Sequence, residues 1–161
     1  MELIVDRAEC RYWWDGLERL ADFRPAPASP YNCLVCDALG TWDPTERDAL
    51  ARALLDSGCR YVVCGGETCE RWHDDVEELL AERAAARGDD GPFVGTTWHT
   101  GEAPGDVAEF FVMHAKGPAA EPAEHLVLQL GLDWDLQNDL MVWVRGWVEH
   151  PYGIDASESA G

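Results

Sequence analysis

Residues 31–36 read Tyr31-Asn32-Cys33-Leu34-Val35-Cys36, and residues 60–64 read Arg60-Tyr61-Val62-Val63-Cys64. Both are short apolar runs rich in aromatic and β-branched residues, which is typical of buried strands. The segment between them opens with Asp43-Pro44, a good N-cap followed by a good first helical residue, and it stops at Gly58. It therefore predicts a helix between two strands.

The same alternation continues toward the C-terminus. Residues 68–86 predict a second helix, because Trp72, Val76 and Leu80 recur at helical spacing. Strands are expected near residues 93–98 and 125–130, with a helix that begins at Pro104 or Asp106 between them. This order predicts an α/β fold in three layers, of Rossmann-like or flavodoxin-like type, with about four mostly parallel strands flanked by helices.

The chain of 161 residues is expected to form a single domain over residues 1–152. Its core is predicted at residues 31–131, with helical flanks at residues 1–30 and 132–152. Residues 15–23 favour a helix, and so do residues 136–148, although residues 140–144 would also suit a strand. Residues 153–161 are small and polar, and we expect a flexible tail there.

The charge is strongly negative. Asp and Glu number 31 and Lys and Arg 12, which gives a formal net charge of −19. Binding to nucleic acid through phosphate neutralisation needs clustered basic residues, so it is excluded, and docking on an anionic membrane is disfavoured. A basic protein partner suits this charge. The oligomeric state is left open.

The first residues carry neither a basic region nor a long apolar stretch, so they do not predict a signal peptide. No run approaches the roughly 18 apolar residues of a membrane helix. We therefore expect a soluble cytoplasmic protein whose six cysteines stay reduced.

Polar residues follow three of the expected strands. Ligands bind beyond the carboxyl ends of strands in open parallel sheets, so we expect these residues to share one rim. The candidates for ligand binding or catalysis after the strands are Asp37, Gly65, Gly66, Glu67, Thr97, Trp98, His99 and Glu102.

The second helix adds Cys69 and His73, which are four residues apart and so share a face. One interpretation is a zinc site, because zinc accepts thiolate and imidazole ligands in tetrahedral geometry. Its ligands would be Cys64, Cys69, His73 and His99. Packing of small buried cysteines is the competing interpretation.

Another interpretation is acid–base or nucleophilic catalysis. Histidine is the usual acid–base side chain at neutral pH, so His73 and His99 are the candidates, and Asp37, Asp74 or Glu102 would orient one of them. Cys64 or Cys69 would act as the nucleophile if a histidine lay within hydrogen-bond reach. Core-edge histidines bonded to backbone are the competing interpretation.

The pair Gly65-Gly66 before a helix offers backbone amides to an anion. Acidic residues outnumber basic ones around the expected rim, however, so an uncharged or cationic ligand, or a metal ion, fits better than a polyphosphate.

The residues Cys64-Gly65, His73-Asp74 and Thr96-Thr97-Trp98-His99 followed by Glu102 resemble the signature of a small bacterial protein family of unknown function. The resemblance covers about residues 31–111. It supports His73, Asp74, Trp98 and His99 as a site, and it implies no reaction.

Two functions remain open on the sequence. The first is a small-ligand-binding or catalytic domain whose site lies at the carboxyl rim and uses histidines and carboxylates, with or without the help of a zinc ion. The second is a non-catalytic acidic interaction protein, an adaptor or an inhibitor from a defence-related or toxin-related operon. The first is the leading interpretation, because polar residues converge after three strand ends. The second is the alternative, and it rests on the charge, the unassigned tryptophans and the lack of a complete catalytic motif.

Overall fold

A computed structural model describes residues 1–152 and places the apolar runs at the centre of a six-stranded sheet. Its order is β1-β2-β6-β3-β4-β5, and every neighbouring pair is parallel except β1 with β2. The α/β prediction is confirmed, with more strands than the four expected. The strands are β1 Glu2–Asp6, β2 Arg11–Leu17, β3 Tyr31–Asp37, β4 Cys59–Gly66, β5 Gly95–Trp98 and β6 Glu124–Leu130.

Capping residues mark the ends of the helices. Asp43 caps the first of them by accepting a hydrogen bond of 2.8 Å from the amide of Glu46, and Gly88 ends the second with φ of 79°. Within residues 1–152 the helices are α1 Pro44–Asp56, α2 Cys69–Arg87, α3 Pro104–Met113 and α4 Trp134–Glu149, with a short 3₁₀ helix η1 at Leu20–Asp22. The helix predicted at residues 136–148 is confirmed by α4.

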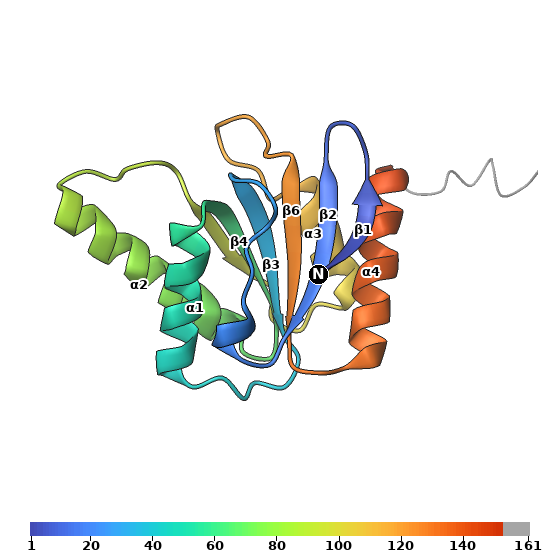
Figure 1. Cartoon of the computed structure of the whole chain (residues 1–161), viewed down its shortest axis with the longest axis horizontal. Coiled ribbons are helices and arrows are strands. Elements are labelled where there is room, and N and C mark those ends of the chain that lie inside the picture. Colours follow the sequence, from blue (N-terminus) through green and yellow to red (C-terminus); the bar gives the residue numbers. More distant parts are fainter. Residues whose placement is uncertain (153–161) are drawn as a thin grey trace, which may run out of the picture.

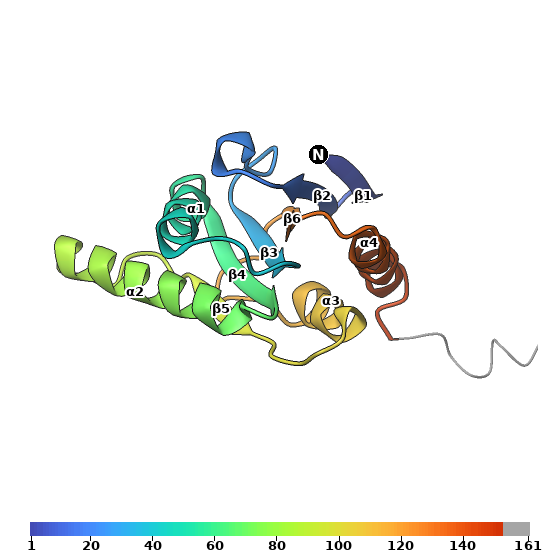
Figure 2. The same cartoon turned by 90° about the horizontal axis from the view of Figure 1, so that it is seen from below.

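The helices lie on both faces of the sheet (Figure 1). The chain moves from β3 to β4 to β5 through α1 and α2, then returns through α3 to β6, which lies between β2 and β3. Because parallel crossovers are right-handed, a reversal of direction along the sheet moves the connecting helix to the opposite face. Figure 2 shows this result, with α1 and α2 on one side and α3 and α4 on the other.

Each face of the sheet has its own buried core. Cys33 and Val35 of β3 pack with α1 and α2, whereas Leu34 and Cys36 pack with α3 and α4. Alternate residues of a strand point to opposite faces, so a strand buried on both sides reads as a continuous apolar run. The same alternation places Cys33 and Cys36 on opposite faces of the sheet.

The prediction of a helical flank at residues 1–30 is wrong. Residues 2–6 and 11–17 form an antiparallel pair, and β2 also pairs in parallel with β6. Buried Glu124 of β6 holds this strand through hydrogen bonds with Arg11 and Trp13. The helical spacing of the apolar residues in 15–23 was coincidental, because strand pairing with β6 took residues 11–17.

No helix within residues 1–152 combines the length and the apolar content needed to cross a bilayer. The tail predicted at residues 153–161 lies outside the described residues.

Candidate functional site

The candidate site lies where β4 and β5 end. After β4 the chain enters α2 on one face of the sheet, and after β5 it enters α3 on the other, so the two connections diverge (Figure 2). Diverging connections after neighbouring parallel strands leave room for a ligand beyond the strand ends. Residues 96–102 and the first turns of α2 supply polar side chains here, in the region that the sequence predicts.

His99 is the centre of a hydrogen-bonded chain on the α3 face. Its Nε2 lies 3.1 Å from Oγ1 of Thr97, and its Nδ1 is hydrogen-bonded to Oε2 of Glu102. The ring packs on Phe110 with centroids 4.5 Å apart and is 9% exposed. A carboxylate only accepts, so in the neutral imidazole Nδ1 carries the proton and Nε2 accepts from the Thr97 hydroxyl.

Glu102 reaches His99 because residues 99–102 turn back on themselves. The amide of Glu102 donates to the carbonyl of His99 over 3.4 Å, and Gly101 adopts φ of 72°, which favours glycine. The amide of His99 donates in turn to the carbonyl of Cys64 over 3.1 Å, which fixes the start of the turn on β4. The carboxylate is therefore positioned by backbone geometry.

His73 occupies the α2 face of the same strand. Its Nδ1 lies 3.2 Å from Oγ1 of Thr96, and its ring centroid is 4.4 Å from that of Trp98. Within residues 1–152 no carboxylate pairs with His73. Asp74 is its neighbour on the helix, but the Asp74 side chain is exposed to solvent. Trp98 is 47% exposed, so this face of the pair is open to solvent.

Strand β5 separates the two histidines. Thr96 and Trp98 point to the α2 face, whereas Thr97 and His99 point to the α3 face, as alternation along an extended chain requires. No group of three His, Cys, Asp or Glu side chains within residues 1–152 is arranged to hold a metal ion. The expected zinc ligands Cys64, Cys69, His73 and His99 are therefore not brought together.

Asp37 is buried and bonded elsewhere. Its Oδ1 accepts from the amide of Gly40 over 2.8 Å, and its Oδ2 accepts from the hydroxyl of Thr68 over 2.8 Å and the indole of Trp72 over 3.2 Å. It is 1% exposed and bonds to neither histidine. The structure therefore gives Asp37 a different role from the predicted one, that of joining the end of β3 to the start of α2.

The glycine pair is explained by packing. Gly66 adopts φ of 90°, and a side chain there would meet the carbonyl of Asp37 at 2.3 Å from its Cβ. Gly65 is buried, and a Cβ would lie 3.3 Å from Val107 of α3. The position of Gly66 therefore requires glycine without any ligand, whereas a side chain at Gly65 would be only slightly crowded. Glu67 is exposed beside them and forms no hydrogen bond within residues 1–152.

The two cysteines proposed as nucleophiles are buried. Burial raises the pKa of Cys64, and a hydrogen bond with Thr96 only partly opposes this, so the side chain is a thiol at neutral pH. Cys69 is 1% exposed, and its Sγ lies 3.5 Å from Oγ1 of Thr100. Neither sulfur has a histidine as its hydrogen-bond partner.

Sequence reasoning missed two things. It did not name Thr96 and Phe110 as partners of the histidines, although alternation along residues 96–99 and the helical spacing after Pro104 could have indicated both. It also missed a cavity of about 550 Å³ at the carboxyl ends of β2 and β6. Asp15, Glu18 and Asp22, from the segment that the sequence predicts as a helix, line that cavity together with Arg24.

Comparison with known proteins gives one match. No curated protein and no solved structure is significantly similar to the chain. A family model matches residues 15–141, a range that includes both histidine clusters and exceeds the expected 31–111. The resemblance to a family of unknown function is thereby confirmed, and the chain belongs to the family described as a domain of unknown function, DUF7684.

Proposed function

We propose that the protein is an acyl-transfer or hydrolytic enzyme in which Thr97 is the nucleophile, His99 the general base and Glu102 the residue that orients the base. One observation carries the proposal, the hydrogen-bonded chain from Glu102 through His99 to Thr97. A hydroxyl beside an imidazole that is held by a carboxylate is the arrangement that activates a nucleophilic oxygen.

The reaction follows from which atom holds which proton. The oxygen of Thr97 forms a bond to the electrophilic carbonyl carbon of the substrate, and its proton moves to Nε2 of His99. Glu102 stabilises the imidazolium that results. His99 then gives this proton to the leaving group as the bond to that group breaks. Water releases the acyl group from Thr97 by the same proton path in reverse.

The surrounding charge supports an uncharged or cationic substrate. Exposed carboxylates line the loops after β4 and β5 and the first turns of α2 and α3, with Arg71 as an exposed base among them. Such a field attracts cations and repels anions. The exposed carboxylates are Glu67, Glu70, Asp74, Glu102 and Asp106.

The test is acetylation by p-nitrophenyl acetate, followed by release of nitrophenol and by intact mass. The wild type should gain one acetyl group on Thr97, located by peptide mass spectrometry. T97V should lose the acetylation and T97S should keep it, because only serine retains the hydroxyl. T96V is the matched control, since it removes the neighbouring hydroxyl on the other face of β5. Equal acetylation of wild type and T97V would overturn the proposal.

A second candidate is a non-catalytic interaction protein, favoured by apolar side chains exposed at the carboxyl rim. Leu39 is 55% exposed, Leu132 59% and Trp134 74%, and they follow the neighbouring strands β3 and β6. Exposed apolar groups within an acidic surface suit a partner with apolar and basic residues. Low-salt capture from the native host with wild type and with a W134A/L132S variant tests this. A basic partner retained only by the wild type supports it, whereas equal capture contradicts it.

A further inference from the structure

The loop before β5 borders a cavity at the amino end of the sheet, opposite to the His99 chain. This cavity has a volume of about 160 Å³ and is bounded by residues 92–93, by the segment 116–122 and by Arg60 of β4. A second cavity of about 130 Å³ lies on the other side of Arg60 and Pro92. The region belongs to no part of the proposed catalytic site.

The walls of the larger cavity are mainly apolar. Pro92 and Phe93 form one side, and Ala119, Ala120 and Pro122 form the other. Gly117 allows the two sides to approach, because a Cβ at that position would lie 2.7 Å from the ring of Phe93. The cavity thus suits the apolar body of a small molecule.

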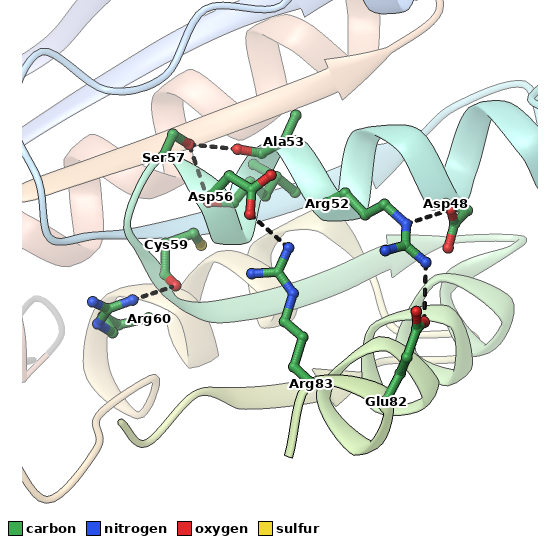
Figure 3. A network of polar contacts seen from close by, with 10 residues as sticks. Asp48, Arg52, Ala53, Asp56, Ser57, Cys59, Arg60, Glu82 and Arg83 are labelled. Carbon is green, nitrogen blue, oxygen red and sulfur yellow. Dashed lines mark hydrogen bonds and ion pairs between the residues drawn. The ribbon is translucent and has the colours of Figure 1, made fainter. Parts of the chain in front are cut away.

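Arg60 provides a positive charge beside these walls. Its only polar contact within residues 1–152 is a weak one of 3.5 Å to the carbonyl of Cys59. Figure 3 shows the contrast with nearby arginines, since Arg83 is paired with Asp56 and Arg52 with Asp48 and Glu82. A half-buried guanidinium without a carboxylate is unusual in a chain of net charge −19.

Other groups line the cavity and fix its shape. Lys116 and Glu121 both line it and form an ion pair over 3.8 Å, so their charges offset each other and the net positive charge comes from Arg60. Buried Asn32 of β3 lines the cavity as well. Its side-chain amide donates a hydrogen bond of 2.9 Å to the carbonyl of Ala115, which holds the start of the 116–122 segment against β3. The site is therefore built before any ligand arrives.

The conformation of the loop before β5 is stabilised by a hydrogen bond within the loop. Gly91 has φ of 64°, and its amide donates to Oδ1 of Asp89 over 2.9 Å. A Cβ at Gly91 would lie 2.3 Å from the guanidinium of Arg87, so glycine lets that side chain lie along the loop. Pro92 and Phe93 follow Gly91 directly, so this turn determines where they lie.

We propose that this cavity binds a small organic monocarboxylate, with the carboxylate on Arg60 and the apolar body against Pro92, Phe93 and the 119–122 segment. A guanidinium recognises a carboxylate through two parallel charge-assisted hydrogen bonds, whereas the apolar walls offer nothing to a fully hydrated anion such as sulfate. The site and the His99 chain lie at opposite ends of β5, so either function can stand without the other.

The test is a titration of ¹⁵N-labelled protein with octanoate, monitored by amide chemical shifts. Octanoate should shift the amides near residues 93 and 117–120 with a dissociation constant of about 10⁻⁴–10⁻³ M. Octylamine, which has the same chain and the opposite charge, should bind about tenfold more weakly or not at all. R60Q should weaken octanoate at least tenfold.

Control variants keep the result interpretable. R52Q removes an arginine whose pairing lies between α1 and α2, and it should bind octanoate like the wild type. F93A should weaken octanoate and octanol alike, because it removes an apolar wall. R60Q should fold normally, since Arg60 forms no ion pair with any residue of the described range 1–152. The proposal is overturned if octanoate causes no shifts up to 10 mM (~10⁻² M), if octylamine binds equally well, or if R60Q matches the wild type.

Discussion

The two faces of β5 carry the same pair of residue types, a threonine and a histidine, and differ in what stands behind the histidine. On the α3 face His99 has Glu102 on one ring nitrogen and Thr97 on the other. On the α2 face His73 has Thr96 on one nitrogen and the Trp98 ring beside it. Only the first arrangement can hold one tautomer and stabilise an imidazolium.

The difference comes from the backbone on which each acid is placed. Glu102 follows His99 by three residues in a tight turn, which brings the carboxylate back to the ring. Asp74 follows His73 by one residue on a helix, where successive side chains diverge by about 100° and do not meet. An acid near a histidine in sequence is therefore informative only when the local backbone is known.

The largest expected effect is a difference in catalytic rate between variants of the two histidines. H99Q should slow acetylation by p-nitrophenyl acetate by about 10²–10⁴-fold, because the general base is lost. H73Q should change the rate less than about threefold, since among residues 1–152 the ring of His73 is bonded to Thr96 and to no carboxylate. Burst kinetics on both variants measures this, with circular dichroism to verify folding. Similar losses in the two variants would remove the distinction between the faces.

The next effect is a loss of stability that should disturb only the α2 face of the sheet. D37A should lower the free energy of unfolding by about 3–4 kcal/mol, because it leaves the indole of Trp72, the hydroxyl of Thr68 and the amide of Gly40 without their acceptor. Urea denaturation measures the loss, and E67A is the exposed control. Amide shifts should change around His73 and stay near wild-type values around His99. Equal disturbance of both sides would show that the faces are not independent.

A third effect concerns stability at acid pH, and it comes from the buried residue His125, which lies outside the candidate site. Burial lowers the pKa of His125 to about 4, although the carbonyl of Pro122 partly opposes this. The ring is fully buried and stacks on Tyr12 with centroids 4.2 Å apart, and apart from the weak contact with Pro122 neither nitrogen has a hydrogen-bond partner within residues 1–152. The folded state therefore strongly prefers the neutral ring.

The unfolded chain protonates this histidine near pH 6.5, so between pH 6.5 and 4 the unfolded state binds more protons than the folded state. The free energy of unfolding should be at its full value above pH 6.5 and should fall by about 3 kcal/mol as the pH drops to 4. H125F should lack this fall while keeping an aromatic ring against Tyr12. Urea denaturation at several pH values compares the two, and parallel profiles would exclude His125 as the cause.

The smallest effect concerns tautomers. ¹⁵N chemical shifts of the imidazoles in neutral protein should show His99 almost wholly as the Nδ1–H form, because Glu102 accepts that proton. His73 should show a mixture, since a threonine hydroxyl can donate or accept. E102Q should weaken the preference at His99 and leave His73 unchanged. A mixture at His99 in the wild type would contradict the proposed orientation of the base.

Much of the fold could be predicted from the sequence. The buried strands β3, β4 and β6 appear as apolar runs, and the helices α1 and α2 carry local signals such as the Asp43 cap and the αL glycine Gly88. These signals depend on nearest neighbours along the chain. The half-buried strand β2 was missed because its pattern of burial depends on β6, which lies more than a hundred residues away.

The candidate site was predicted in part. Residues 96–102 were placed at a strand end because composition and turn signals mark it, and the structure has them there. The division of that segment into two faces was not foreseen, although alternation along a strand implies it. The role of Asp37 could not be inferred, since it depends on donors from α2, whereas burial of Cys64 was one of the two interpretations that the sequence left open.

The sequence alone determined the class of fold, the positions of its buried strands and capped helices, and the acidic character of the surface, because each is a property of residues close together in the chain or of composition. Only the tertiary structure decided that β6 lies between β2 and β3, that Glu102 and not Asp37 bonds to a histidine, and that Arg60, beside a mainly apolar cavity, forms no ion pair with any carboxylate of residues 1–152. These facts depend on contacts between distant segments, whose geometry is set by the handedness of the crossovers and the packing of helices on both faces of one sheet.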